Sequence, residues 1–213
     1  MFEKMEIRRI VNGKWEENCY IVSDGQDAVI IDPGGNFEEL EEYTNGNGLK
    51  VWAVINTHAH FDHIVSVADV VDAFKCPFYL HSADKRLLRS ANLYMSLFMG
   101  EAPIRVPVVD RELDNTALPL VFGNLRIEVM HTPGHTDGGV CFLIGDHLFT
   151  GDTLMKGSIG RLDLPGGNKE KMKISLQKIA SMPNGLKIYP GHGETSTIAA
   201  ELEHNEAFKS FLK

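Results

Sequence analysis

The heptapeptide Thr57–His63, THAHFDH, decides the interpretation of this sequence. Four of its side chains could bind a metal ion: His58, His60, Asp62 and His63. The heptapeptide follows the apolar run Val51–Ile55, which predicts a buried strand. A loop that leaves a strand can turn all four side chains toward one point, whereas a helix would spread them over several directions. Because imidazoles and carboxylates are ligands that divalent metals such as zinc accept, the heptapeptide predicts a metal site.

Composition and charge limit the class of protein. The chain has 213 residues, of which 43% are hydrophobic and 23% charged, as expected for a globular protein. We see no Pro-rich or Ser-rich linker, so we expect a single domain over residues 1–213. The net charge of -8 disfavours a nucleic-acid partner, because such partners require patches of Lys and Arg.

The cysteines and the amino terminus indicate a cytoplasmic protein. The three cysteines lie far apart and form no Cys-x-x-Cys pair, so a disulfide framework is not expected. The first ten residues, MFEKMEIRRI, mix charges where a signal peptide requires an apolar core. No apolar run approaches the roughly 20 residues that span a bilayer. We therefore expect no contact with a membrane.

Apolar runs separated by turn-forming residues predict two sets of strands, each followed by helices. The first set comprises strands at Met5–Val11, Asn18–Ser23, Asp27–Ile31 and Val51–Ile55, with helices from about Phe37 and over Ile64–Phe74. The second set comprises strands at Leu125–Met130, Val140–Ile144, His147–Phe149 and Lys187–Tyr189, with helices from about Asn168 and Ser196. Two sheets packed face to face, with helices on both outer faces, would bury every apolar face. The sequence thus predicts an α/β fold.

Three further candidate ligands lie just beyond predicted strands. They are His135 in HTPGHT, Asp152 in FTGDTL and His192 in YPGHG, each next to a Gly that lets the backbone turn sharply. Together with the heptapeptide they make five His and two Asp, too many for one tetrahedral zinc. They suit two metals that share a carboxylate and keep positions open for water. The remaining histidines are interpreted as structural, with His131 as a candidate to orient His135.

The order and spacing of THAHFDH, HTPGHT, GDTL and PGHG resemble the metallo-β-lactamase superfamily, over about residues 18–208. The sequence is most similar to the glyoxalase II-like hydrolases, in a short form without their helical carboxy-terminal domain. The resemblance implies a four-layer αβ/βα sandwich and two Zn²⁺ ions, with iron or manganese as alternatives at either site. It divides the ligands into two triads bridged by Asp152: His58, His60 and His135 for the first metal, and Asp62, His63 and His192 for the second.

The implied activity is hydrolysis of a thioester such as a hydroxyacylglutathione by a metal-bridging hydroxide. Asp62 would help to orient that hydroxide. Arg161 stands where glyoxalase II has a basic residue for a substrate carboxylate, although it could equally pair with Asp163. Glu194 replaces the tyrosine that glutathione-using relatives have two residues after the last histidine, so the thiol is left open.

Other superfamily activities fit the same motifs. A persulfide dioxygenase would use a single iron on the residues matching His58, His135 and Asp152, an arrangement typical of non-haem iron oxygenases. A lactonase would use the same dinuclear site on a small-molecule ester. A structural zinc site is disfavoured, because such sites are closed at four ligands and often contain Cys. The sequence leaves the oligomeric state open.

Overall fold

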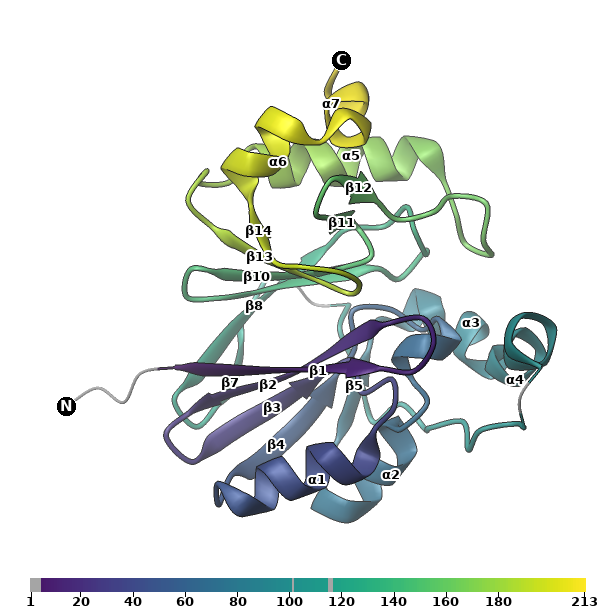
Figure 1. Cartoon of the computed structure of the whole chain (residues 1–213), viewed down its shortest axis with the longest axis vertical. Coiled ribbons are helices and arrows are strands. Elements are labelled where there is room, and N and C mark those ends of the chain that lie inside the picture. Colours follow the sequence, from purple (N-terminus) through teal and green to yellow (C-terminus); the bar gives the residue numbers. More distant parts are fainter. Residues whose placement is uncertain (1–4, 101, 115–116) are drawn as a thin grey trace.

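Two six-stranded sheets face each other in the computed structural model, which describes residues 5–100, 102–114 and 117–213. Helices α1 (Phe37–Gly46) and α2 (Val67–Phe74) lie on the outer side of the first sheet (Figure 1). Helices α5 (Lys169–Ala180), α6 (Ile198–His204) and α7 (Glu206–Leu212) lie on the outer side of the second sheet. The predicted four-layer order of helix, sheet, sheet and helix is confirmed.

The first sheet is antiparallel at its start and parallel afterwards. Its strands, in spatial order, are β1 (Glu6–Asn12), β2 (Glu17–Asp24), β3 (Asp27–Ile31), β4 (Lys50–Ile55), β5 (Phe78–Leu80) and β6 (Arg111–Glu112). Pairing is antiparallel from β1 to β3 and parallel from β3 to β6. The carboxyl ends of β3 and β4 therefore meet at one edge, which brings Asp32 next to the start of the heptapeptide.

The second sheet brings two further loops to the same side of the molecule. Its strands, in spatial order, are β14 (Ser196–Thr197), β13 (Lys187–Pro190), β10 (His147–Gly151), β9 (Val140–Ile144), β8 (Leu125–His131) and β7 (Leu120–Phe122). Because β10 and β13 are parallel, the loops that follow them, with Asp152 and His192, leave at the same edge. A small hairpin, β11 (Leu154–Met155) and β12 (Ser158–Ile159), interrupts the Gly-rich loop after β10.

Two helices begin slightly later than predicted. The helix expected from Ile64 begins at Val67, because a 3₁₀ turn over Phe61–His63 and further tight turns precede it. The helix expected from Ser196 begins at Ile198, because β14 pairs with β13 and the Thr197 side chain accepts a hydrogen bond from Ala200 N. Between β5 and β6 the chain forms two short helices, α3 (Lys85–Arg89) and α4 (Ala91–Tyr94).

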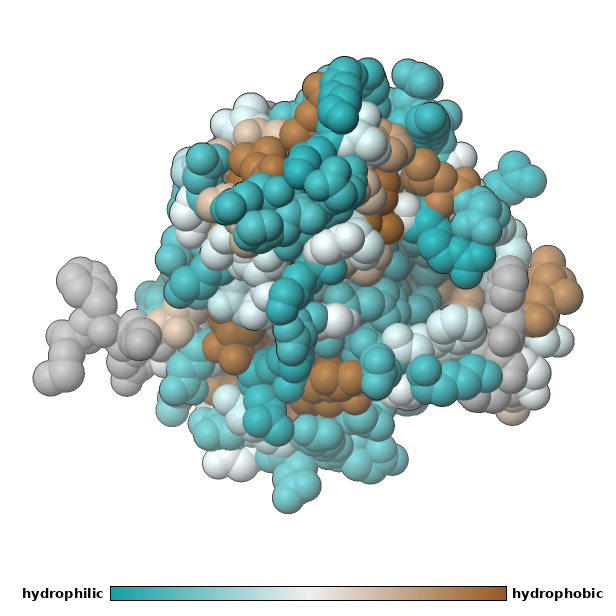
Figure 2. Space-filling model, turned by 45° about the horizontal axis from the view of Figure 1, so that its top comes forward, coloured by the Kyte–Doolittle hydropathy of each residue, from teal (hydrophilic) through white to brown (hydrophobic). Residues whose placement is uncertain are grey.

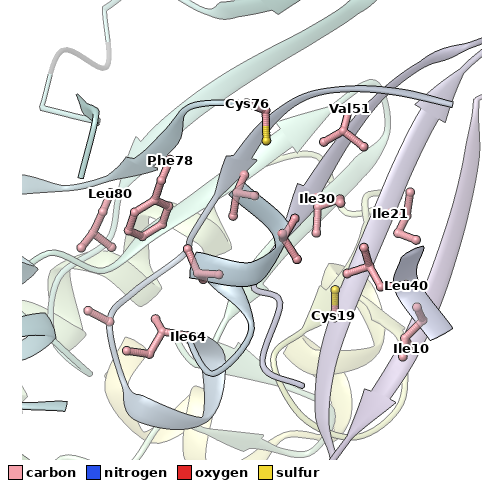
Figure 3. Close-up of a cluster of buried hydrophobic side chains, with 14 of the residues drawn as sticks. Ile10, Cys19, Ile21, Ile30, Leu40, Val51, Ile64, Cys76, Phe78 and Leu80 are labelled. Atoms are coloured by element: carbon pink, nitrogen blue, oxygen red, sulfur yellow. The ribbon is translucent and has the colours of Figure 1, made fainter. Parts of the chain in front are cut away.

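Three buried apolar clusters separate the four layers. The first lies between the first sheet and helices α1 and α2, and Figure 3 shows its side chains, among them Ile21 and Phe78. The second fills the space between the sheets, where Tyr20 contacts Phe149 edge to face at 5.2 Å between ring centroids. The third, which includes Met172, lies between the second sheet and helices α5, α6 and α7. Full burial of one such side chain contributes about 1.5–3 kcal/mol, so these clusters hold the strand ends rigidly.

Figure 2 shows the hydropathy of one face of the molecule. That face is mostly hydrophilic, and its hydrophobic side chains occur in separate small areas. Within the described part of the chain, no helix is long and apolar enough to cross a bilayer.

Candidate metal centre

The heptapeptide loop is fixed at its start by Asp32, which follows β3. The Asp32 carboxylate accepts hydrogen bonds from the backbone N of Thr57, at 2.7 Å, and from the Thr57 hydroxyl, at 2.6 Å. Asp32 itself has a φ of 50°, the left-handed region that Asp adopts more readily than most residues. The sequence analysis did not identify Asp32 as part of the site. Its position at the end of a strand parallel to β4 was the signal that could have identified it.

The first predicted triad is assembled. His58, His60 and His135 are buried, and each offers a ring nitrogen within 4.8 Å of the others. The closest approach is 2.8 Å, between His60 Nδ1 and His135 Nε2. The His58 ring lies 4.9 Å from each of the other two rings, between centroids.

The second predicted triad is assembled on the other side of His58. Asp62, His63 and His192 offer ligand atoms within 4.8 Å of one another. His192 Nε2 lies 3.3 Å from Asp62 Oδ2, and the His63 and His192 rings are 5.3 Å apart between centroids. Asp62 and His192 are partly exposed, whereas His63 is fully buried. This half of the site therefore faces the solvent.

Asp152 lies between the two triads. Its Oδ2 atom is 3.4 Å from His135 Nε2 in the first triad and 3.6 Å from His192 Nε2 in the second. Its Oδ1 atom is 3.6 Å from His63 Nε2. One carboxylate thus faces both triads.

The ring nitrogens that point away from the centre lie against backbone and side-chain oxygens. His135 Nδ1 donates to the Arg161 carbonyl at 2.8 Å, and His192 Nδ1 donates to the Trp15 carbonyl at 2.9 Å. Because a carbonyl only accepts, each ring carries its proton on Nδ1 when neutral, which leaves an Nε2 lone pair facing inward. His63 Nδ1 lies 3.2 Å from Asp32 Oδ2 in the same manner.

Charge and burial also fit a cation at this centre. Burial, with the neighbouring imidazoles, lowers the pKa of His58 and lowers that of His60 to about 3, so both rings are neutral ligands at pH 7. Burial raises the pKa of Asp152, but the nearby His192, His63 and His135 outweigh it and hold that pKa below its ordinary value. Among the described residues, three buried atoms that face the centre have no hydrogen-bond partner: Nε2 of His58 and of His63, and Oδ1 of Asp152. Metal ions would satisfy them, and the donor set is one that zinc and iron accept.

Sequence reasoning missed Asp84, which ties the two ligand loops together. This buried carboxylate accepts hydrogen bonds from Ala59 N at 3.0 Å, Thr136 Oγ1 at 2.8 Å and Gly138 N at 2.6 Å. The first donor belongs to the heptapeptide and the other two to the His135 loop. Asp84 lies in a short turn between β5 and α3, and no pattern in the sequence marks it.

The hypothesis that His131 orients His135 is wrong. The His131 ring stacks on His81 at 4.2 Å between centroids, and its Nε2 bonds the Asp137 carbonyl at 3.0 Å. The Arg161 carbonyl orients His135 instead. His131 is the last residue of β8, four residues before His135. At this position its ring lies against His81 and not against His135.

A cavity of about 360 Å³ opens beside the centre. Its walls combine ligand residues with apolar side chains and one arginine: Trp15, His60, Phe61, Asp62, His135, Asp152, Met155, Arg161, Leu164 and His192. The Arg161 guanidinium makes two hydrogen bonds to the Asp163 carboxylate, at 2.8 and 3.0 Å, on the exposed rim. A small molecule could reach the centre through this cavity.

Comparison with known proteins decides the family. Residues 12–192 match the family model of the metallo-beta-lactamase superfamily. The chain belongs to this superfamily.

Several superfamily members are similar over almost the whole chain. The probable metallo-hydrolase YqgX of Bacillus subtilis (strain 168) is 31% identical over 97% of this chain and 99% of its own length. Among solved structures, the B3 metallo-β-lactamase BLEG-1 is 36% identical, with a TM-score of 0.88 over 94% of this chain and 98% of that one. TTHA1623, crystallised in a di-iron-bound form, is 37% identical, with a TM-score of 0.86 over 93% and 98%.

Proposed function

We propose that this chain is a dinuclear metal-dependent hydrolase that cleaves a thioester of the hydroxyacylglutathione type. The observation that carries the proposal is the position of Asp152, whose one carboxylate lies within 3.6 Å of nitrogens from both triads. A mononuclear site on His58, His135 and Asp152 would leave the second triad without a metal, whereas a carboxylate that faces both triads suits two metals. The name of YqgX, a probable metallo-hydrolase, supports the same class of reaction.

Each triad would hold one metal ion, and zinc is the metal we propose for both. His58, His60 and His135 would hold the first ion, in the buried half. Asp62, His63 and His192 would hold the second, in the half that faces the cavity, with Asp152 shared. Iron is the main alternative, because TTHA1623 was crystallised with two irons. When bound, such ions lower the pKa of a coordinated water to about 7 and supply hydroxide at neutral pH.

The residues of the chain would then position the substrate and the attacking water. Asp62 lies at the partly exposed edge, where its carboxylate could accept a hydrogen bond from that water and fix its direction. The apolar walls of Trp15, Phe61 and Leu164 would exclude bulk water from the scissile carbonyl. Arg161 lines the same cavity, where it is paired with Asp163. Its guanidinium would release Asp163 and form an ion pair with a substrate carboxylate instead.

One set of test substrates distinguishes the proposed activity from three other activities. A persulfide dioxygenase would consume oxygen on a glutathione persulfide. A lactonase would prefer an acyl lactone, and the similarity to BLEG-1 makes a β-lactam worth including. Since iron alone does not separate a hydrolase from a dioxygenase, the test must record oxygen uptake as well as product.

The test offers the purified protein a hydroxyacylglutathione, a lactone, a β-lactam and a glutathione persulfide, with thiol release, ring opening and oxygen uptake recorded. We expect thiol release from the hydroxyacylglutathione without oxygen uptake. His135→Ala should abolish it, and His131→Ala is the matched control, since His131 stacks on His81 outside the centre. Oxygen uptake on the glutathione persulfide with no thioester cleavage would contradict this proposal and indicate a dioxygenase. Selective ring opening of the lactone or the β-lactam would indicate that the substrate is not a thioester.

A further inference from the structure

Glu17 is a buried carboxylate to which neither the fold nor the proposed reaction assigns a role. It begins β2 and is 1% exposed. Its Oε2 atom accepts a hydrogen bond from Asn12 Nδ2 at 2.8 Å, whereas Oε1 has no hydrogen-bond partner in the described part of the chain. A buried carboxylate is costly unless a cation or hydrogen-bond donors compensate it.

Oε1 faces the second triad. It lies 3.7 Å from His63 Nδ1, the ring nitrogen that points away from the proposed metals, and Asp32 Oδ2 lies 3.2 Å from the same atom. Two carboxylates thus share one imidazole nitrogen. Carboxylates behind a metal-binding histidine fix its ring and make the opposite nitrogen a stronger ligand.

The Glu17 carboxylate is buried and closely packed on the side of Gly34. Gly34 packs against it so tightly that a Cβ atom there would lie 2.3 Å from Glu17 Oε2 and 1.9 Å from the Asp62 carbonyl. Glycine at position 34 therefore lets the Glu17 carboxylate and the heptapeptide loop approach each other. This packing places the Glu17 carboxylate next to His63.

The same segment also holds the other histidine of the second triad. The Glu17 backbone forms an isolated β-bridge with His192, and the Trp15 carbonyl accepts from His192 Nδ1 at 2.9 Å. Asn18 N donates to the Gly191 carbonyl at 2.7 Å, and its side chain donates to the Gly193 carbonyl at 2.9 Å. Residues 15–18 thus contact His63 through a side chain and the His192 loop through the backbone.

We propose that Glu17 is a positioning residue that sets the affinity of the second metal site, through His63, without setting that of the first. The inference rests on the proposed dinuclear function. A carboxylate oxygen behind His63 Nδ1 fixes the ring and leaves Nε2 to bind a cation. Because groups behind metal ligands are typically worth about 10- to 100-fold in metal affinity, loss of the Glu17 carboxylate should weaken the second site by that factor.

Glu17→Gln tests the proposal, because glutamine keeps the size of the side chain and can still accept from Asn12. Zinc binding to the metal-free protein is measured in competition with a chromophoric chelator, and bound zinc is counted after gel filtration. We expect a second dissociation constant about 10- to 100-fold weaker than in the wild type, with the first unchanged within about threefold. Glu17→Asp, which keeps a carboxylate, should recover part of the loss.

Glu201→Gln is the matched control. Glu201 is also buried, at 3% exposed, and its carboxylate accepts from Gly157 N and Asn205 Nδ2, both at 2.8 Å. This variant removes a buried carboxylate elsewhere, so both zinc constants should stay at the wild-type values. If Glu17→Gln fails to fold, as judged by circular dichroism, Glu17→Asp against the wild type decides, with a selective loss at the second site expected.

Two results would overturn the inference alone: two unchanged zinc constants in Glu17→Gln, or an equal weakening of both sites, which would indicate a general structural role. A wild-type protein that binds a single zinc would overturn the dinuclear proposal together with this inference. Thioester cleavage does not enter the measurement, so a wrong substrate leaves the result valid.

Discussion

Asp84→Ala should be among the most destabilising single changes in this chain. The Asp84 side chain is 1% exposed and accepts hydrogen bonds from Ala59 N, Thr136 Oγ1 and Gly138 N. Each buried donor that loses its acceptor costs about 1–1.5 kcal/mol, so three donors give about 3–5 kcal/mol. For a chain of this length, this lowers the melting temperature by roughly 6–20 °C.

The loss is measured by urea unfolding of the metal-free protein, followed by circular dichroism, so that metal binding does not contribute. Asp146→Ala is the control, since Asp146 is exposed and its ion pairs with His147 and Lys187 should contribute less than about 1 kcal/mol. A loss below about 1 kcal/mol for Asp84→Ala would refute the idea that this carboxylate ties the two ligand loops together.

Three further predictions follow from the same geometry. His58→Ala should reduce turnover more than about 100-fold and leave the far-ultraviolet circular dichroism unchanged, because even groups behind metal ligands are worth 10- to 100-fold; unchanged activity would contradict the site. Removal of metal by a chelator should abolish activity and lower the melting temperature, both restored by zinc, since a ligand at 100 times its Kd stabilises by about 2.7 kcal/mol. Burial raises the pKa of Cys76 and of Cys141 to about 11, so both thiols should react with a thiol reagent at pH 8 far more slowly in the native than in the unfolded protein; equal rates would contradict their burial.

The candidate ligands could be selected from the sequence because their signal is local. His58, His60, Asp62 and His63 lie within one loop, and each remaining candidate follows a strand and adjoins a glycine. The structure brings all seven together, because β3 and β4 run parallel, as do β10 and β13, and their carboxyl ends share an edge. Apolar periodicity likewise predicted the layers, since each face had to be buried.

The groups behind the ligands could not be predicted, because their roles arise only from tertiary contacts. Asp84 is 24 residues from His60 along the chain, and Glu17 is 46 residues from His63. Both resemble ordinary surface acids in the sequence. His131 misled for the opposite reason: it is close to His135 along the chain, but β8 directs its ring toward His81. The start of α2 was misplaced because apolar spacing does not distinguish tight turns from the helix that follows them.

The central claim is that Asp152 joins two metal sites, and anomalous diffraction from zinc-loaded crystals tests it most directly. We expect two anomalous peaks per chain. One should lie about 2.0–2.2 Å from nitrogens of His58, His60 and His135, and the other at similar distances from Asp62, His63 and His192. The Asp152 carboxylate should contact both. A single peak, or a second peak away from Asp152, would contradict the account.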